Sequence, residues 1–229
     1  MQSSSRRTQL LVLAAFAATA VVALVLVSAL GGDDSSEPGG SGPSLEGIPQ
    51  QGTVLGEPGA PATLTEFADL QCPFCAEFAT GAVPSLIDDY VRPGKLKLDF
   101  AVLAFLGPDS EEAARMAAAA SLQDRLWNFV EAFYRNQGTE NSGYVDEAFL
   151  SDIAEQAGVD VEQALAELDS PEVQRVLDLS AAAAERLGVN STPSFALGGA
   201  GSPPRLVQVQ ALEAGSLDAD IDEFLDQAR

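Results

Sequence analysis

The only two cysteines of the 229-residue chain lie three positions apart, in the segment Cys72-Pro73-Phe74-Cys75. They stand where one hydrophobic pattern gives way to another. Ala62–Leu70 mixes Thr, Phe and Leu with the partial alternation of a strand. From Cys72 onward, apolar residues recur at the three- and four-residue spacing of a helix. The pair therefore marks a strand-to-helix junction, and this junction constrains the fold more than any other feature.

A second strand pattern follows the helix and completes a βαβ unit. Lys95–Phe105 begins with alternation and becomes continuously apolar, as expected of a strand that enters a buried sheet. Pro84 lies inside the intervening helical pattern, where it predicts a kink rather than two separate helices.

Helical periodicity dominates from Ser110 to Gly188 and predicts an inserted helical subdomain. Its best-delimited helix has Ser170 as N-cap, a first-turn proline and Gly188 as its stop. The other helical candidates are Glu111–Arg135, Asp146–Gln156 and Val161–Leu168. Beyond the insertion we expect a hairpin of residues 193–197 and 205–209 and a last helix from about Ser216. The predicted order is βαβ, helices, ββα, which is an α/β fold.

The residue counts exclude several kinds of site. Histidine is absent, so histidine bases and histidine-ligated haem are excluded, and two cysteines cannot supply the four Cys/His ligands of a structural zinc site. We therefore expect neither a metal nor a cofactor. The 34 acidic against 12 basic residues, a formal charge of −22, argue against nucleic acid as a partner.

The first 30 residues predict a membrane anchor. The run 10–30 is apolar and long enough to span a bilayer, and Arg6 and Arg7 before it place the N-terminus in the cytoplasm. We expect a cytoplasmic segment at 1–9, a transmembrane helix at 10–30, a flexible linker at 31–52 and the folded domain at 53–229. The alternative is a cleaved signal peptide and a secreted protein.

A Cys-x-x-Cys pair at a helix N-terminus is suited to dithiol exchange. The helix dipole and the free N–H groups of the first turn stabilise a thiolate on Cys72, which we expect to be the exposed nucleophile. Cys75, one turn later and facing inward, would resolve the mixed disulfide. A static disulfide or half of a metal site are the alternatives. A disulfide that closes so small a loop stabilises the fold little, because it removes little entropy from the unfolded chain.

The segment from Glu66 through Cys75, together with GVNSTPSF at residues 188–195, resembles the DsbA-like thiol–disulfide oxidoreductases of the thioredoxin superfamily. The resemblance covers about Val54 to the C-terminus and implies a thioredoxin-like fold. It implies that Pro193 is a cis-proline and that the backbone of Thr192 pairs with substrate.

The resemblance also gives Glu66 a role, as a buried acid that accepts the Cys75 proton; an edge-exposed strand acid is the alternative. We expect Asp69, on the same strand, to face solvent. A substrate groove near Phe74, Pro193 and Phe195, capped by the helical insertion, is a further expectation, although these residues are equally good core candidates.

One position departs from the best-known members, which have histidine where Phe74 stands. Without that positive charge the reduced form should be less favoured, which predicts a weaker oxidant. The acidic field should also disfavour the Cys72 thiolate and leave the helix N-terminus as its main support.

The resemblance implies an extracytoplasmic enzyme that transfers its Cys72–Cys75 disulfide to exported proteins with cysteine thiols. A redox partner that resets the dithiol, an anchor in the membrane and a monomeric state are further expectations. The alternatives are a reductase or isomerase of the same fold, or an acidic binding module without enzymatic activity.

Overall fold

The structure is a computed structural model, and it describes residues 45–199 and 201–227. The predicted anchor at 10–30 and most of the predicted linker lie outside these residues. Within the described ranges, no helix combines the length and the apolar character that a membrane span requires.

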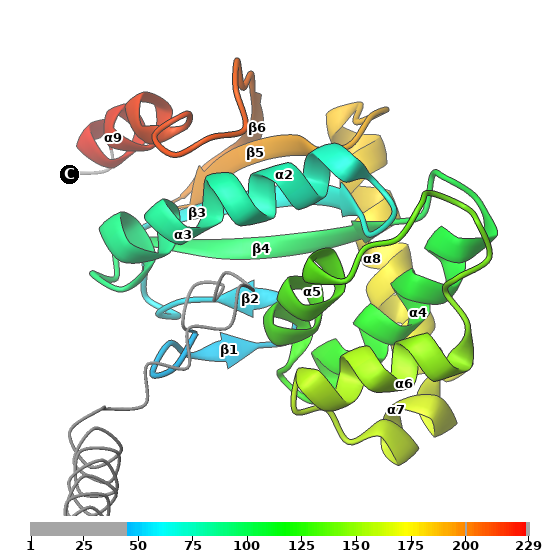
Figure 1. Cartoon of the computed structure of the whole chain (residues 1–229). Coiled ribbons are helices and arrows are strands. Elements are labelled where there is room, and N and C mark those ends of the chain that lie inside the picture. The colour runs from blue at the N-terminus through cyan, green and yellow to red at the C-terminus, as the bar shows by residue number, and fades with distance from the viewer. Residues whose placement is uncertain (1–44, 200, 228–229) are drawn as a thin grey trace, which may run out of the picture. The chain divides into compact units, whose positions relative to one another are not determined.

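A mixed sheet forms the centre of the described domain (Figure 1). In the described residues its strand order is β1-β2-β4-β3-β5-β6. The central strand β3 runs parallel to β4 and antiparallel to β5. The strands are β1 (Gln50–Gln51), β2 (Val54–Leu55), β3 (Ala62–Asp69), β4 (Leu96–Leu103), β5 (Ser194–Gly199) and β6 (Ser202–Val207). The four predicted strands are all present, and the short β1–β2 pair, which the sequence did not predict, begins the sheet before residue 53.

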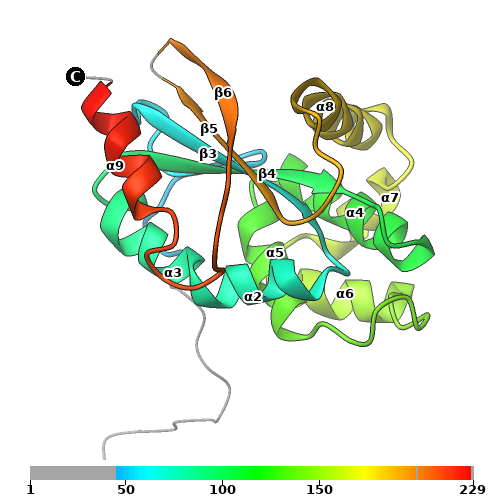
Figure 2. The same cartoon turned by 90° about the horizontal axis from the view of Figure 1, so that it is seen from above.

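Helices cover both faces of this sheet, with α2 and α8 on opposite sides (Figures 1 and 2). They are α2 (Pro73–Gly81), α3 (Val83–Leu86), the π-helix η1 (Ile87–Val91), α4 (Pro108–Leu122), α5 (Leu126–Arg135), α6 (Glu147–Gln156), α7 (Val161–Glu167), α8 (Pro171–Leu187) and α9 (Asp218–Gln227). Because strand side chains alternate between faces, Phe100 belongs to the main core with Phe78 of α2, while Phe67 packs in a second cluster with Ala184 of α8. The βαβ…ββα order of a thioredoxin-like fold is thus confirmed.

The helical insertion also matches the prediction, with one difference. The Ser170 hydroxyl caps α8 by accepting the Val173 N–H at 3.2 Å, and Gly188 ends the helix with a φ of 72°. The predicted stretch Glu111–Arg135 is two helices, α4 and α5, because the chain turns at Asp124, whose φ is 56°.

Pro84, inside the first helical pattern, cannot donate a backbone hydrogen bond, yet the backbone around it keeps helical angles. Ala82, between α2 and α3, keeps right-handed helical angles (φ −94°, ψ −38°), and its N–H donates to the Phe78 carbonyl oxygen. The expectation of one kinked helix is nevertheless wrong, because α2 and α3 are separate helices, and η1 follows α3 directly.

Candidate active site

The Cys-x-x-Cys segment joins the end of β3 to the first turn of α2. Cys72 is the N-cap of α2, in an extended conformation, and Pro73 takes the first helical position, where its missing N–H costs no hydrogen bond. Both cysteines are free thiols. Cys75 is 0% exposed, as expected, but Cys72 is only 4% exposed. The prediction of an exposed nucleophile is therefore wrong.

Main chain from the far end of the sequence contacts the Cys72 sulfur. The Cys72 thiol donates to the Thr192 carbonyl oxygen, with Sγ and O 3.4 Å apart. The Thr192–Pro193 peptide bond is cis, which confirms the conformation that the family resemblance implied. The antiparallel pairing of β3 with β5, in which Glu66 lies opposite Phe195, brings the Thr192–Pro193 loop to the N-terminus of α2.

The pKa of Cys72 is lowered from 9.0 to about 6. The largest cause is a hydrogen bond from the Cys75 thiol; Thr192 and the backbone N–H groups of Cys75 and Phe74 contribute smaller amounts, and burial acts in the opposite direction. The helix N-terminus thus supports the thiolate, but the expectation that it would be the main support is wrong, because the neighbouring thiol contributes more.

Cys75 has the opposite electrostatic environment. Burial raises the pKa of its thiol far above the ordinary value, and the hydrogen bond that it makes with Cys72 raises it further. At neutral pH Cys72 is therefore a thiolate while Cys75 keeps its proton. This difference makes Cys72 the nucleophile of the pair and Cys75 the group whose proton must be moved during exchange.

Glu66 is a buried acid beside the dithiol. It is 3% exposed, and burial, with a smaller contribution from the Cys72 charge, raises its pKa from 4.5 to about 8. Its Oε1 atom has no hydrogen-bond partner within the described residues. The alternative of an edge-exposed acid is wrong, because β3 lies between β4 and β5.

Asp69 was expected to face solvent, and this expectation is also wrong. Its carboxylate is fully buried at the end of β3 and accepts four hydrogen bonds. The donors are the N–H groups of Gln71 (2.8 Å), Phe105 (2.6 Å) and Leu106 (3.1 Å) and the Ser110 hydroxyl (2.7 Å). Asp69 therefore ties the loop before Cys72 to the loop after β4.

Two glutamines that the sequence did not single out hold the same loop. The Gln137 amide donates to the carbonyl oxygens of Leu70 (2.7 Å) and Cys72 (3.2 Å), and the Gln71 amide donates to the Tyr144 hydroxyl (2.7 Å). Gln137 and Tyr144 belong to the helical insertion, about 70 positions from the dithiol, so no local pattern marks them. The one feature of the sequence that could have pointed to these contacts is Asp69, the last residue of a central strand, because loops meet at the end of such a strand.

A groove of about 570 Å³ lies beside the dithiol. Phe74 (59% exposed), Pro193 and Phe195 line it, as expected. The rest of the lining comes from residues 188–191, Ser194 and residues 206–212. Of the predicted insertion only its last residue, Gly188, lines the groove, so the expectation that the insertion caps it is wrong. No charged side chain lines it in the described part of the chain.

Residues that could hold a metal ion do not gather near this site. Across residues 45–199 and 201–227, no three Cys, Asp, Glu or His side chains cluster as a metal ion requires. The titratable groups that the structure brings together at this site are the two thiols and the buried carboxyl group of Glu66.

Similar proteins share this arrangement of elements. Residues 49–208 match a family model described as Thioredoxin. A stretch of 149 residues is 31% identical to the probable disulfide bond formation protein D of Bacillus cereus, covering 63% of this chain and 69% of that protein. The crystal structure of a thioredoxin-like oxidoreductase from Silicibacter pomeroyi is 30% identical, with a TM-score of 0.58, and the match covers 80% and 92% of the two chains. Oxidised BdbD from Bacillus subtilis, 22% identical with a TM-score of 0.66 over 81% and 97%, shares the fold.

Proposed function

The chain belongs to the DsbA-like thiol–disulfide oxidoreductases of the thioredoxin superfamily, and from this premise we propose that it is a dithiol oxidase of exported proteins. The observation that carries the proposal is the opposite displacement of the two thiol pKa values, low for Cys72 and high for Cys75. A low pKa on Cys72 stabilises the reduced enzyme relative to its disulfide, which makes that disulfide a better oxidant.

The proposed reaction has two steps. A substrate thiolate attacks Cys72 Sγ, the Cys72–Cys75 bond breaks, and Cys75 leaves with the electron pair and takes up a proton. A second substrate thiolate then attacks the substrate sulfur of the mixed disulfide and releases Cys72 as a thiolate. The substrate dithiol is thereby oxidised to a disulfide and the enzyme disulfide is reduced to a dithiol.

Glu66 is the proposed proton donor and acceptor for Cys75. With a pKa of about 8 the carboxyl group is protonated at neutral pH, so it is ready to protonate Cys75 as that sulfur leaves. In the reverse step it accepts the same proton. Protonation of the leaving group favours attack on Cys72 by a substrate thiolate, which is the direction of an oxidase.

The substrate is proposed to bind across Thr192, Pro193 and Phe74. The backbone of Thr192 would pair with an extended substrate segment next to Cys72, which it already contacts. The adjoining groove, which Phe74 lines, would hold the neighbouring side chains of the substrate. Because the groove is uncharged, it would not repel acidic substrate segments, as the rest of so acidic a chain would.

The location and partners belong to the same proposal. The DsbA-like family acts outside the cytoplasm. Residues 10–30 would anchor this chain, as a monomer, with its domain on the extracytoplasmic side. A membrane-bound or soluble electron acceptor would reoxidise the dithiol after each turnover, because oxidation of substrate leaves Cys72 and Cys75 reduced.

The test uses a reduced, unfolded protein with two cysteines as substrate. The oxidised full-length chain should convert it stoichiometrically to the disulfide form, and Cys72→Ser should abolish this. Cys75→Ser, given a disulfide-containing substrate, should accumulate a mixed disulfide through Cys72 that is visible by mass spectrometry. Full oxidation by Cys72→Ser would overturn the proposal. A reduction potential of the pair near that of thioredoxin would instead identify a reductase.

A further inference from the structure

The proton that Cys75 exchanges has to travel between a buried carboxyl group and solvent. Glu66 lies on a central strand, 3% exposed, and its Oε1 atom has no hydrogen-bond partner in residues 45–199 and 201–227. Since each turnover loads or unloads one proton at this group, the fold needs a route by which Glu66 exchanges protons with water.

A cavity of about 20 Å³ lies on the inner side of Glu66, between β3, the α2–α3 segment and α5. This volume is sufficient for one water molecule. Its walls are mostly apolar, from residues such as Val83 and Val130. The indole N–H of Trp127, which also lines the cavity, is already used, because it donates to the Thr53 carbonyl oxygen at 2.9 Å.

The cavity has a second carboxyl group in its wall, that of Glu131 on α5. The Glu131 side chain is 21% exposed, so it reaches both the cavity and the surface. On the outer side its Oε1 atom pairs with Arg135 Nη1 at 3.5 Å. Burial raises the pKa of Glu131, and the charge of Arg135 lowers it by a smaller amount.

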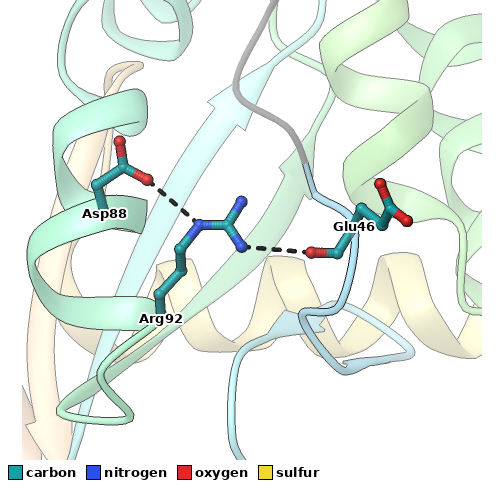
Figure 3. Close-up of polar contacts among 3 residues, drawn as sticks. All are labelled: Glu46, Asp88 and Arg92. Atoms are coloured by element: carbon teal, nitrogen blue, oxygen red, sulfur yellow. Dashed lines mark hydrogen bonds and ion pairs between the residues drawn. The ribbon is translucent and has the colours of Figure 1, made fainter.

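Leu45 forms another part of the wall of the same cavity. It is buried and lines the cavity, and the next residue along the chain is held in place by Arg92 at the end of η1. Arg92 donates from Nη1 to the Glu46 carbonyl oxygen at 3.3 Å and from Nε to Asp88 Oδ1 at 3.2 Å (Figure 3). Leu45 thus adds an apolar wall, and Glu131 is the carboxyl group besides Glu66 in the lining of the cavity.

We propose that Glu131 is the outlet of a proton relay, in which one water molecule in the cavity connects its carboxyl group with that of Glu66. When Cys75 takes a proton from Glu66, the Glu66 carboxylate regains one from the water, the water from Glu131, and Glu131 from solvent. The reverse sequence removes a proton. Glu131 touches no reacting atom and acts only through Glu66, so the inference rests on the proposed role of Glu66.

Other titratable groups near Glu66 do not offer this route. Cys72 and Cys75 are the reacting groups, and Tyr134 is buried, with a strongly raised pKa, and donates to the Asp69 carbonyl oxygen at 3.3 Å. Among the groups that face Glu66 across the cavity or the dithiol, Glu131 is the one that also reaches an ion pair at the surface.

The experiment is a carbon-13 NMR titration of glutamate side-chain carboxyl groups in the reduced full-length chain. The Glu66 resonance is assigned by its loss in Glu66→Gln, and we expect it to titrate near pH 8. Exchange broadening at its midpoint reports how fast the proton enters and leaves. We expect Glu131→Gln to slow this exchange at least tenfold, whereas Glu155→Gln, an exposed glutamate on the neighbouring helix α6, should leave it unchanged.

A second variant separates the relay from any structural effect of losing the Glu131 charge. Ala79→Val places methyl groups in the cavity without altering a charge, and it should slow the exchange in the same way by excluding the water. An unchanged Glu66 line shape in folded Glu131→Gln, or in folded Ala79→Val, would overturn the relay. Since no substrate is present, such a failure would leave the mixed-disulfide test of the oxidase unaffected.

Discussion

Cys72 Sγ lies 3.4 Å from the carbonyl oxygen of Thr192, a residue 120 positions later in the chain. Main chain from the far end of the sequence therefore contacts the reactive sulfur directly. A polypeptide bound at Cys72 would lie next to the Thr192 main chain, which is why we propose this loop as the segment that aligns the substrate. The contact also depends on the β3–β5 pairing, which ties the geometry of the nucleophile to the centre of the sheet.

The Cys72 thiolate should depend on its partner thiol. Because the hydrogen bond from Cys75 is the largest cause of the low Cys72 pKa of about 6, Cys75→Ala should raise that pKa by about one pH unit or more. Cys75→Ser retains a hydroxyl donor and should raise it less. The pH dependence of Cys72 alkylation by iodoacetamide measures both values; identical profiles for Cys75→Ala and the unaltered chain would contradict this prediction.

Glu66 should make the reduced protein less stable as the pH rises. Between pH 4.5 and about 8 the unfolded chain has lost this proton while the folded chain keeps it, so the free energy of unfolding falls with pH. The loss for one proton is about 1.4 kcal/mol per pH unit. Glu66→Gln lacks the effect, and its stability relative to the parent should improve over this range and level off above about pH 8.

Urea unfolding of both reduced proteins at a series of pH values measures that difference. The lowered pKa of Cys72 acts in the opposite direction: its stabilisation is complete above pH 9.0 and is lost as the pH falls through about 6. Since both proteins retain Cys72, this effect largely cancels in the comparison. Parallel curves for the two proteins would show that Glu66 ionises normally in the folded state.

Asp69 should be a major contributor to stability. Asp69→Ala leaves four donors of the loops around the dithiol without their acceptor, and we expect the free energy of unfolding to fall by about 3 kcal/mol or more. Asp152→Ala, on an exposed position of α6, is the matched control and should change stability by less than about 0.5 kcal/mol. Similar, small losses in both variants would refute the role of Asp69.

The order of elements was predictable because its signals are local. The cap at Ser170 and the stop at Gly188 bracket α8 within a few residues of sequence. The β1–β2 pair escaped prediction because two-residue strands have no measurable periodicity, and β2 is held by the distant β4, where Val54 pairs with Asp99.

The candidate site was predictable only as far as its motif. The position of the dithiol and of Pro193 followed from short segments and from family resemblance. The burial of Cys72, the burial of Asp69 and the hydrogen bonds of Gln137 depend on segments that are remote in sequence, and the side chain of a strand residue shows its partners only when the sheet is assembled. The sequence-based predictions were therefore wrong at residues whose exposure is determined by tertiary contacts, such as Cys72 and Asp69.

Gly81 should control the approach of the groove loop to α2. A Cβ atom at this position would lie 2.8 Å from the Leu212 carbonyl oxygen, so the main chain that lines the groove would have to move. We expect Gly81→Ala to cost about 1–3 kcal/mol and to slow the oxidation of peptide substrates. Gly59→Ala, where a Cβ atom meets nothing within 4 Å, is the control. Equal rates and stabilities for the two variants would contradict the close approach.

Phe74 should set the strength of the oxidant. Its side chain is 59% exposed between the two cysteines, so a substitution there leaves the core intact. In Phe74→His, an imidazolium next to Cys72 would stabilise the thiolate, and therefore the reduced form, by charge and hydrogen bonding. We expect the reduction potential of the pair, measured by equilibration with glutathione, to become more oxidising by roughly 30 mV or more, since 30 mV corresponds to about 1.4 kcal/mol for two electrons. Phe74→Leu keeps an uncharged, apolar side chain and should leave the potential unchanged.

Because the chain has no other histidine, the imidazole titration of Phe74→His is directly visible by NMR, and it should show a raised pKa while Cys72 is a thiolate. Equal potentials for Phe74→His and Phe74→Leu would contradict the prediction that this position sets the strength of the oxidant.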